Sequence, residues 1–284
     1  MSLTYYCYRR RKDKGIPLSE GIIEILTITN NQIIMNMKTL SCSLLIFFLV
    51  FSHPVSTRAQ AIIDFETGAV FNGYNDVRIP GGQGTLFSLT DQLKGEVKPF
   101  LRLRASYIIN SRHTLSILYA PLETKSRGTV PYDILYEGTT FNANTKLTGT
   151  YKFNSYRLTY RYNFLQTPKL ELGLGLTAKI REARILISSV QSISEKTNVG
   201  FVPIINFRFL WKVDDNFGVL LEGDALAAPQ GRAEDILVAA TYKLSDNLKI
   251  RAGYRILEGG TDNKEVYNFS LFHYASVGIS YTIF

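Results

Sequence analysis

Beyond residue 61, apolar and polar residues alternate with a period of two, the period of a β-strand whose faces meet different environments. In residues 156–164 the even positions hold three tyrosines, a leucine and a phenylalanine, and the odd positions hold two arginines, a threonine and an asparagine. Ten such segments occur, at about 62–72, 99–110, 114–122, 156–164, 169–181, 201–213, 217–226, 236–244, 248–257 and 271–284. The pattern predicts an all-β chain.

The connections between these segments alternate in length. Short turns lie at 111–113, 166–168, 214–216 and 245–247, and longer polar connections lie at 73–98, 123–155, 184–200, 227–235 and 258–270. An even number of strands, with short turns at one end and long loops at the other, is typical of outer-membrane barrels. We predict a closed antiparallel transmembrane β-barrel of about ten strands, with eight or twelve as alternatives, short periplasmic turns and long extracellular loops.

The aromatic residues of the apolar face separate this prediction from a soluble β-sandwich or lipocalin-like barrel. A soluble barrel packs its apolar face inward, whereas a membrane barrel turns that face to lipid between two aromatic girdles. The expected girdle residues are Tyr162, Phe164, Trp211, Phe217 and Tyr242 near the short turns, and Phe71, Tyr119, Tyr156 and Phe201 near the long loops. This distribution favours the membrane barrel.

The first 61 residues have the organisation of a secretory signal. Met37 and Lys38 precede an apolar stretch at 40–52, and Ala59-Gln60-Ala61 follows as a small-x-small cleavage site. The apolar stretch is too short to cross a bilayer as a helix. The expected divisions are an upstream extension outside the fold at 1–36, a signal peptide at 37–61 and a single outer-membrane barrel domain at 62–284.

Composition narrows the chemistry. The two cysteines, Cys7 and Cys42, both precede the predicted cleavage site, so the exported chain would have no disulfide and no cysteine ligand. Removing residues 1–61 removes seven basic and three acidic residues and lowers the net charge from +8 to +4. A strongly basic chain would suggest nucleic acid as a partner, and this reduction weakens that interpretation. We expect no nucleic-acid partner, no metal site and no cofactor.

The polar face of the strands is strongly basic. If this face lines the lumen, five acids and twelve bases point inward. The acids are Asp64, Glu66, Glu171, Glu222 and Asp224, and the bases are Arg102, Arg104, Arg157, Arg161, Lys179, Arg181, Arg208, Lys212, Lys243, Lys249, Arg251 and Arg255. The excess of seven positive charges exceeds the net charge of +4, so the outer loops must be acidic on balance.

Hairpin register pairs some of these charges. Counting back from the turn at 214–216 sets Arg208 opposite Glu222 and Asn206 opposite Asp224, where side chains meet at close range. These pairings predict that charges of opposite sign meet inside the barrel.

The same count on the preceding hairpin sets Asn163 opposite Glu171, with Arg161 one diagonal away. The candidate site is a lumen network of Glu66, Arg102, Arg104, Arg157, Arg161, Glu171, Lys179, Arg181, Arg208, Glu222, Asp224, Arg251 and Arg255. We favour a salt-bridge network that fills a narrow lumen, because ten strands enclose little space and long side chains can fill it. The alternative is a basic, water-filled passage for anionic solutes.

The last strand, at 271–284, alternates and closes on the aromatic residue Phe284. In these features residues 62–284 resemble the small outer-membrane β-barrel proteins of Gram-negative bacteria, the broad OmpA/OmpW-like group and ten-stranded barrels such as the omptins. The resemblance implies an outer-membrane location reached through the periplasm, contact with outer-membrane lipid, and recognition of the strand ending in Phe284 by the barrel-insertion machinery.

We expect a non-enzymatic protein with a structural or surface-interaction role and a mostly plugged lumen. A narrow anion-preferring channel is the first alternative and an omptin- or deacylase-like hydrolase is the second. A hydrolase would need a base at the outer rim, such as His273, with an acid such as Asp262 or Glu265, or with a serine, and no catalytic residue is assigned. An extracellular ligand could bind aromatic residues of the long loops, namely Tyr74, Tyr132, Tyr136, Phe141, Tyr151 and Tyr267.

Overall fold

The computed structural model describes residues 59–229 and 231–283. The upstream extension, the signal peptide up to residue 58 and the terminal Phe284 lie outside the described residues. The barrel wall consists of β1 (Gln60–Arg78), β4 (Lys98–Ile109), β5 (His113–Ala120) with β6 (Glu123–Thr129), β9 (Lys146–Gln166), β10 (Leu170–Ser188), β11 (Ile193–Lys212), β12 (Phe217–Ala228), β13 (Gly231–Lys243), β14 (Leu248–Asp262) and β15 (Tyr267–Ile283). The connections contain β2 (Phe87–Ser88), β3 (Leu93–Gly95), β7 (Ile134–Tyr136) and β8 (Thr139–Phe141).

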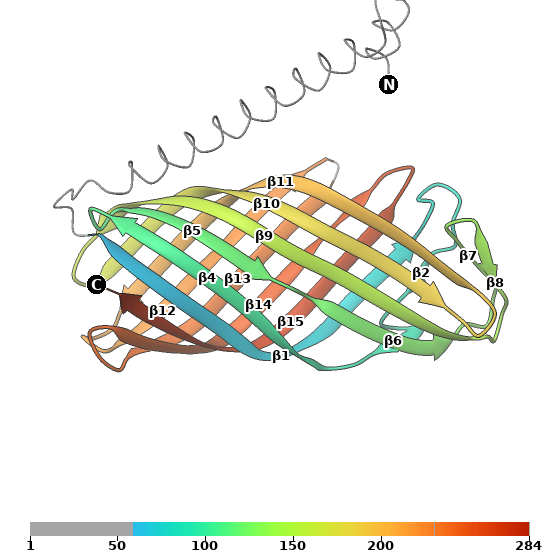
Figure 1. The fold of residues 1–284 in the computed structure, drawn as a ribbon, viewed down its shortest axis with the longest axis horizontal. Coiled ribbons are helices and arrows are strands. Elements are labelled where there is room, and N and C mark those ends of the chain that lie inside the picture. Colours follow the sequence, from blue (N-terminus) through green and yellow to red (C-terminus); the bar gives the residue numbers. More distant parts are fainter. Residues whose placement is uncertain (1–58, 230, 284) are drawn as a thin grey trace, which may run out of the picture. The chain divides into compact units, whose positions relative to one another are not determined.

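The wall is a closed antiparallel barrel of ten strand positions (Figure 1). Each strand pairs with its neighbours, and the pairing of β1 with β15 closes the ring. The third position is shared by β5 and β6, which both pair with β9 on either side of Pro121. Proline has no backbone N–H to donate to a strand ladder, which accounts for the interruption. The predicted all-β barrel and its ten strands are confirmed.

Three of the expected long loops are strands instead. Residues 184–200 form the outer halves of β10 and β11 with a turn between them, and the segments 227–235 and 258–270 are likewise mostly strand. Only the connections at 79–97 and 130–145 are long, and these contain short strands of their own. Hydrophobic alternation ends where a strand leaves the apolar environment, so the sequence pattern placed these strand ends too early.

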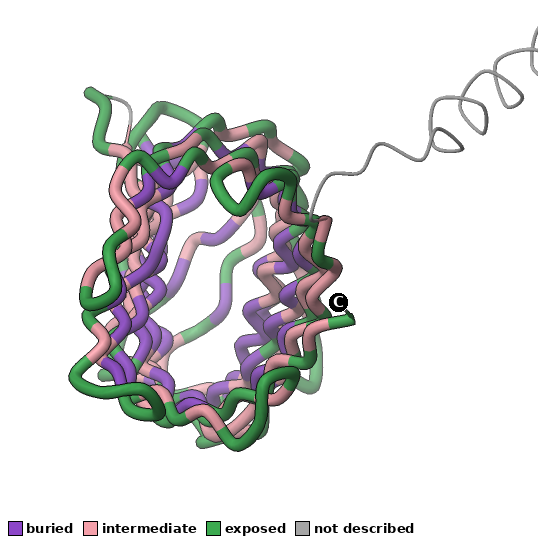
Figure 2. Tube along the Cα trace, turned by 90° about the vertical axis from the view of Figure 1, so that its left-hand side faces the viewer, coloured by how far each residue is buried: buried purple, intermediate pink, exposed green. Residues whose placement is uncertain are grey.

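The outer surface carries the predicted apolar belt. Leu174, Leu176 and Ile205 are 49–69% exposed on the outside of the wall, while buried positions alternate with them and face the interior (Figure 2). All nine predicted girdle aromatics are exposed as well. Tyr119 and Tyr156 are paired across β5 and β9 and stack at 5.3 Å between ring centroids. None of the described residues forms a helix long and apolar enough to cross a membrane.

The end of the barrel that carries the long connections, called here the loop end, has its own apolar core. Leu89 and Leu93, from the connection between β1 and β4, and Ile134 and Tyr136 from β7 are fully buried in it. They pack against wall residues such as Ile187 of β10. The two long connections therefore pack against the wall at this end of the barrel. The opposite end, where the short turns lie, is called the turn end.

Candidate functional site

A layer of buried charges crosses the lumen. It contains three carboxylates and three guanidinium groups from six strands, and each of these residues is at most 4% exposed. This ionic layer comprises Glu66 on β1, Arg102 on β4, Arg157 on β9, Asp224 on β12, Asp235 on β13 and Arg255 on β14. The strands β4 and β9 lie across the barrel from β12 and β13 in the strand order, so ion pairs between them span the lumen.

Glu66 is held by arginines from two other strands. Nε and Nη2 of Arg255 donate hydrogen bonds of 2.8 Å each to its two carboxylate oxygens. Nη2 of Arg251 donates another at 3.0 Å, and Nε of Arg102 lies 3.9 Å from the same carboxylate. A buried carboxylate is tolerated when donors compensate its lost hydration, and these arginines provide that compensation.

Asp235 connects the two halves of the layer. It accepts hydrogen bonds from Nη2 of Arg102 at 2.9 Å and from Nη1 of Arg255 at 2.5 Å. Nη2 of Arg157 lies 2.5 Å from the same carboxylate, and Nη1 of Arg157 donates to Asp224 at 2.6 Å. The ion pairs therefore form a continuous chain from Arg255 on β14 through Asp235 on β13 and Arg157 on β9 to Asp224 on β12. The chain crosses the lumen where it reaches Arg157.

The hairpin of β11 and β12 has the predicted register. Asn206 is opposite Asp224 and Arg208 is opposite Glu222. Nη1 of Arg208 donates a 2.5 Å hydrogen bond to Glu222, and Nη1 of Arg104 donates a second at 2.8 Å from across the lumen. Nδ2 of Asn206 donates to Asp224 at 2.9 Å. Glu222 thus adds a further point where opposite walls are joined.

The predicted register of the preceding hairpin is wrong. The structure pairs Asn163 with Gly173, and Glu171 lies opposite Gln166. A β-bulge between Leu172 and Gly173 shifts the register, and a count along the sequence could not detect an inserted residue. Glu171 forms its ion pair instead with Lys212 of β11, at 2.6 Å.

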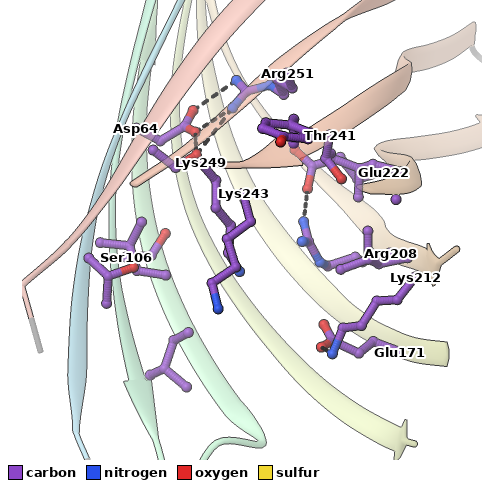
Figure 3. A pocket seen from close by; sticks show the side chains of 18 of the residues that line it. Asp64, Ser106, Glu171, Arg208, Lys212, Glu222, Thr241, Lys243, Lys249 and Arg251 are labelled. Atoms are coloured by element: carbon purple, nitrogen blue, oxygen red, sulfur yellow. Dashed lines mark hydrogen bonds and ion pairs between the residues drawn. The ribbon is translucent and has the colours of Figure 1, made fainter. Parts of the chain in front are cut away.

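A basic cavity of about 610 Å³ lies between the ionic layer and the short turns (Figure 3). This turn-side cavity is lined by Lys212, Lys249 and Arg161 among others. Lys249 makes no ion pair with any residue in the described part of the chain, and Arg161 has only a long 3.5 Å contact with Asn206. The cavity therefore carries more positive charge than its own carboxylates neutralise.

One acid at the rim of this cavity is held ionised by the backbone. The Asp214 carboxylate accepts hydrogen bonds from the backbone N–H groups of Phe217 at 2.7 Å and Asn216 at 2.8 Å. These donors favour the charged form and hold the pKa of Asp214 below its ordinary value. The turn itself lies outside the membrane-spanning strands, so this negative charge faces water.

Sequence reasoning missed Asp235, which pairs with all three arginines of the layer, more than either of the other two acids does. The predicted strand began at residue 236, so this acid was assigned to a loop. The next lumen-facing positions along β13, Leu237 and Ala239, are apolar and pack with Leu210 and Leu220. The alternation of charged and apolar residues that marked the other lumen acids is therefore absent here. The remaining signal was that Asp235 lies an even number of residues before Leu237 and Ala239, on the same face of the strand.

Two predicted network members are not part of the ionic layer, although Lys179 lies opposite its Arg157 on the neighbouring strand. Lys179 and Arg181, on β10, line a second cavity toward the loop end. Neither forms an ion pair with any residue the structure describes. Arg104, Arg208 and Arg251 also line the turn-side cavity.

The histidine considered for a hydrolase, His273, faces away from the lumen and contacts Tyr254 and Phe71 on the outside of the wall. Nδ1 of the other described histidine, His113, lies 2.8 Å from the Tyr160 hydroxyl in the exposed belt. Neither histidine lines the turn-side cavity or the second cavity. Across residues 59–229 and 231–283, no cluster of three or more His, Cys, Asp or Glu side chains is arranged to hold a metal ion.

The aromatic residues considered for an extracellular ligand divide into two groups. Tyr136, Phe141 and Tyr151 are at most 4% exposed and belong to the apolar core of the loop end. Tyr132 is 38% exposed. Half of the proposed aromatic surface is thus used for packing.

A closed ten-stranded antiparallel barrel with an exposed apolar belt and a charged lumen is the architecture of bacterial outer-membrane β-barrels. Comparison with solved structures gives the same class. The outer membrane protease OmpT from Escherichia coli matches with a TM-score of 0.51 and 11% identity, over 79% of this chain and 97% of that chain.

Two further matches are more distant. Ail, the attachment invasion locus protein of Yersinia pestis, has a TM-score of 0.36 and 11% identity, over 78% of this chain and 99% of that chain. Neisserial surface protein A has a TM-score of 0.32 and 14% identity, over 78% and 97%. No protein-family model and no curated protein matches the sequence. The barrel architecture together with the OmpT match gives the chain the fold of an outer-membrane barrel.

Proposed function

We propose that this protein is a sealed, non-enzymatic outer-membrane barrel that acts through the surface of its loop end. The observation that carries the proposal is the ionic layer, whose buried ion pairs link opposite walls of the lumen. A permeating ion would have to separate charges that are almost fully removed from water. Breaking a buried pair costs about 3–5 kcal/mol, and the path through this layer crosses several.

The length of the strands supports a role outside the membrane. Ile180 of β10 lies opposite Tyr156 and Phe201 at the loop-side girdle. Residues 181–188 continue the strand beyond it. At ~3.3 Å per residue and a tilt of ~45°, this part projects by about 20 Å. The barrel would therefore present a rigid, folded extension to the outside instead of mobile loops.

An anion-preferring channel is the second candidate, and one observation favours it. Both cavities carry cations without an ion-pair partner in the described chain, such as Lys249 and Arg161 on the turn side and Lys179 and Arg181 on the loop side. Rings of basic side chains select anions in pores. A hydrolase has less support, because neither described histidine lines either of these cavities.

Planar-bilayer recording of the refolded barrel distinguishes these functions. We expect no stepwise current from the native protein. The double variant Arg157→Ser with Asp224→Ser removes both members of one ion pair from the layer. If the layer is the seal, we expect this variant to conduct. An anion-selective current from the native protein would overturn the sealed barrel and favour the channel.

A further inference from the structure

Lys179 is a buried lysine without an ion-pair partner. It is only 2% exposed, and its ammonium group makes no ion pair or hydrogen bond with any residue in the described chain. Its one contact of defined geometry is with an aromatic ring: Nζ lies 4.9 Å from the centroid of Phe153. Burying an unpaired charge is costly, so such a group normally has a functional reason.

The ionic layer does not need Lys179 for neutrality. Within the layer, three arginines already balance three carboxylates. Next to it, Arg251 balances Asp64, and both Arg104 and Arg208 contact the single carboxylate of Glu222. The adjoining charges thus already include a surplus cation. Lys179 adds positive charge where no further compensation of carboxylates is required.

Lys179 faces a cavity of about 330 Å³ on the loop side of the ionic layer, called here the loop-side cavity. Arg181, two residues along β10, lines the same cavity and also has no ion-pair partner in the described chain. Tyr151, Phe153 and Phe272 contribute an aromatic wall. A concave site with aromatic lining and a few converging polar groups is the usual form of a small-molecule site, and this volume is within its range.

The other cations that line this cavity already have ion-pair partners. Arg184 pairs with Glu195 at 3.6 Å, and Lys196 pairs with Glu137 at 3.1 Å. Arg232 is engaged by a carboxylate of β14 at 2.8 Å. The cations of this cavity that have no ion-pair partner in the described chain, Lys179 and Arg181, therefore share it with the aromatic wall.

We propose that the loop-side cavity binds a small organic carboxylate with an aromatic or other planar apolar body. The carboxylate would pair with Lys179 and Arg181, and the apolar body would pack against Phe153 and Tyr151. Pairing would supply the direct partner that both cations lack, in surroundings where charge-assisted hydrogen bonds are strong. This proposal rests on the proposed function in one respect: it takes the ionic layer to close the cavity, so that the cavity is not part of a passage through the barrel.

Calorimetric titration with 2-naphthoate, on the barrel in zwitterionic nanodiscs, tests this site. The neutral analogue 2-naphthamide measures the apolar contribution alone, and sodium sulfate measures the charge contribution alone. We expect saturable binding of 2-naphthoate and at least tenfold weaker binding of both analogues. Equal binding of 2-naphthamide would contradict the role of the cations, and equal binding of sulfate would contradict the role of the aromatic wall.

Lys179→Met and Arg181→Gln should each weaken 2-naphthoate binding at least tenfold. Lys249→Met removes an unpaired cation from the turn-side cavity, so it is the matched control and should leave binding unchanged. Lys179→Met should fold, because it replaces an unpaired buried charge with an apolar group of similar length. Arg181→Gln provides the same test at a half-buried position. Unchanged affinity in both variants, or absence of saturable binding to native protein, would overturn the proposal.

The bilayer recordings separate this result from the proposed function. A conducting barrel that binds 2-naphthoate in the Lys179-dependent way contradicts the seal and supports the site. A silent barrel that does not bind it contradicts the site and supports the seal.

Discussion

Arg255 and Glu66 are joined by two parallel hydrogen bonds of 2.8 Å each, although their strands are separated by β15. The guanidinium and carboxylate side chains are 2% and 3% exposed. This geometry is the bidentate arrangement in which arginine and carboxylate match best. Because Arg255 also donates a hydrogen bond to Asp235, it links the Glu66 carboxylate of β1 to the Asp235 carboxylate of β13.

Glu66→Gln should destabilise the barrel by about 3–5 kcal/mol, because it leaves buried guanidinium groups without their carboxylate. The loss should appear as a lower urea midpoint for unfolding from liposomes. Glu182→Gln is the matched control, since its ion pair with Lys152 is substantially exposed and solvent screens the attraction, so its loss should have little effect on stability. Equal effects of the two substitutions would contradict a dry ionic layer.

Gly278→Ala should also weaken the layer, by about 2 kcal/mol. A Cβ atom at this position would come within 2.5 Å of Cζ of Arg251, so the guanidinium would have to leave its place beside Asp64 and Glu66. Gly82→Ala is the control because a Cβ there meets nothing within 4 Å, and its effect should stay within about 0.5 kcal/mol. Thermal unfolding followed by heat-dependent gel mobility compares the two variants. If Gly278→Ala matched Gly82→Ala, the packing of Arg251 over this glycine would be irrelevant to stability.

The fold could be predicted from sequence because lipid imposes one rule on every strand. Positions such as Leu174 must be apolar where they face the bilayer, and that requirement produces the period of two. Beyond the girdles both faces of the wall meet water or protein, so no such rule applies. The outer half of β10, at 181–188, could not be recognised for that reason.

The lumen was predictable only where charge alternated with apolar residues. Arg208 and Glu222 follow a regular hairpin, and their pairing was correctly predicted. Asp235 was missed because its lumen-facing neighbours are apolar, and Glu171 was misplaced because a bulge changed the register. Which charges meet across the barrel depends on the curvature of the whole wall, which no local sequence pattern contains.

Leu176→Arg should cost about 2–4 kcal/mol in a bilayer, because Leu176 is 69% exposed on the lipid-facing side and lies between Leu174, which pairs with Tyr162 of one girdle, and Ile180, which pairs with Tyr156 of the other. Thr241→Arg places the same side chain in the turn-side cavity, where water can hydrate it, and should cost less. Urea titration of both variants in liposomes measures the difference. The reverse order would mean that the apolar face is not in contact with lipid.

Substitutions around Glu222 test whether its two arginines share one carboxylate. Each guanidinium side chain is 23% exposed and the carboxylate is 6% exposed, so the cluster is intermediate between a buried and a surface pair. Glu222→Gln should cost about 2–4 kcal/mol because both cations lose their partner. Arg208→Gln should cost only about 1 kcal/mol, because Arg104 still compensates the carboxylate. The coupling energy between Arg208 and Glu222 should therefore rise when measured in an Arg104→Gln background.

That triple cycle also distinguishes a shared carboxylate from two independent contacts. Independent contacts would give the same coupling energy for Arg208 and Glu222 with and without Arg104. A coupling energy below about 0.5 kcal/mol in both backgrounds would show a solvated lumen, because pairs in water contribute little. Since Arg104 lies on β4 and Glu222 on β12, a coupling energy that depends on Arg104 means that the two walls are energetically linked across the lumen.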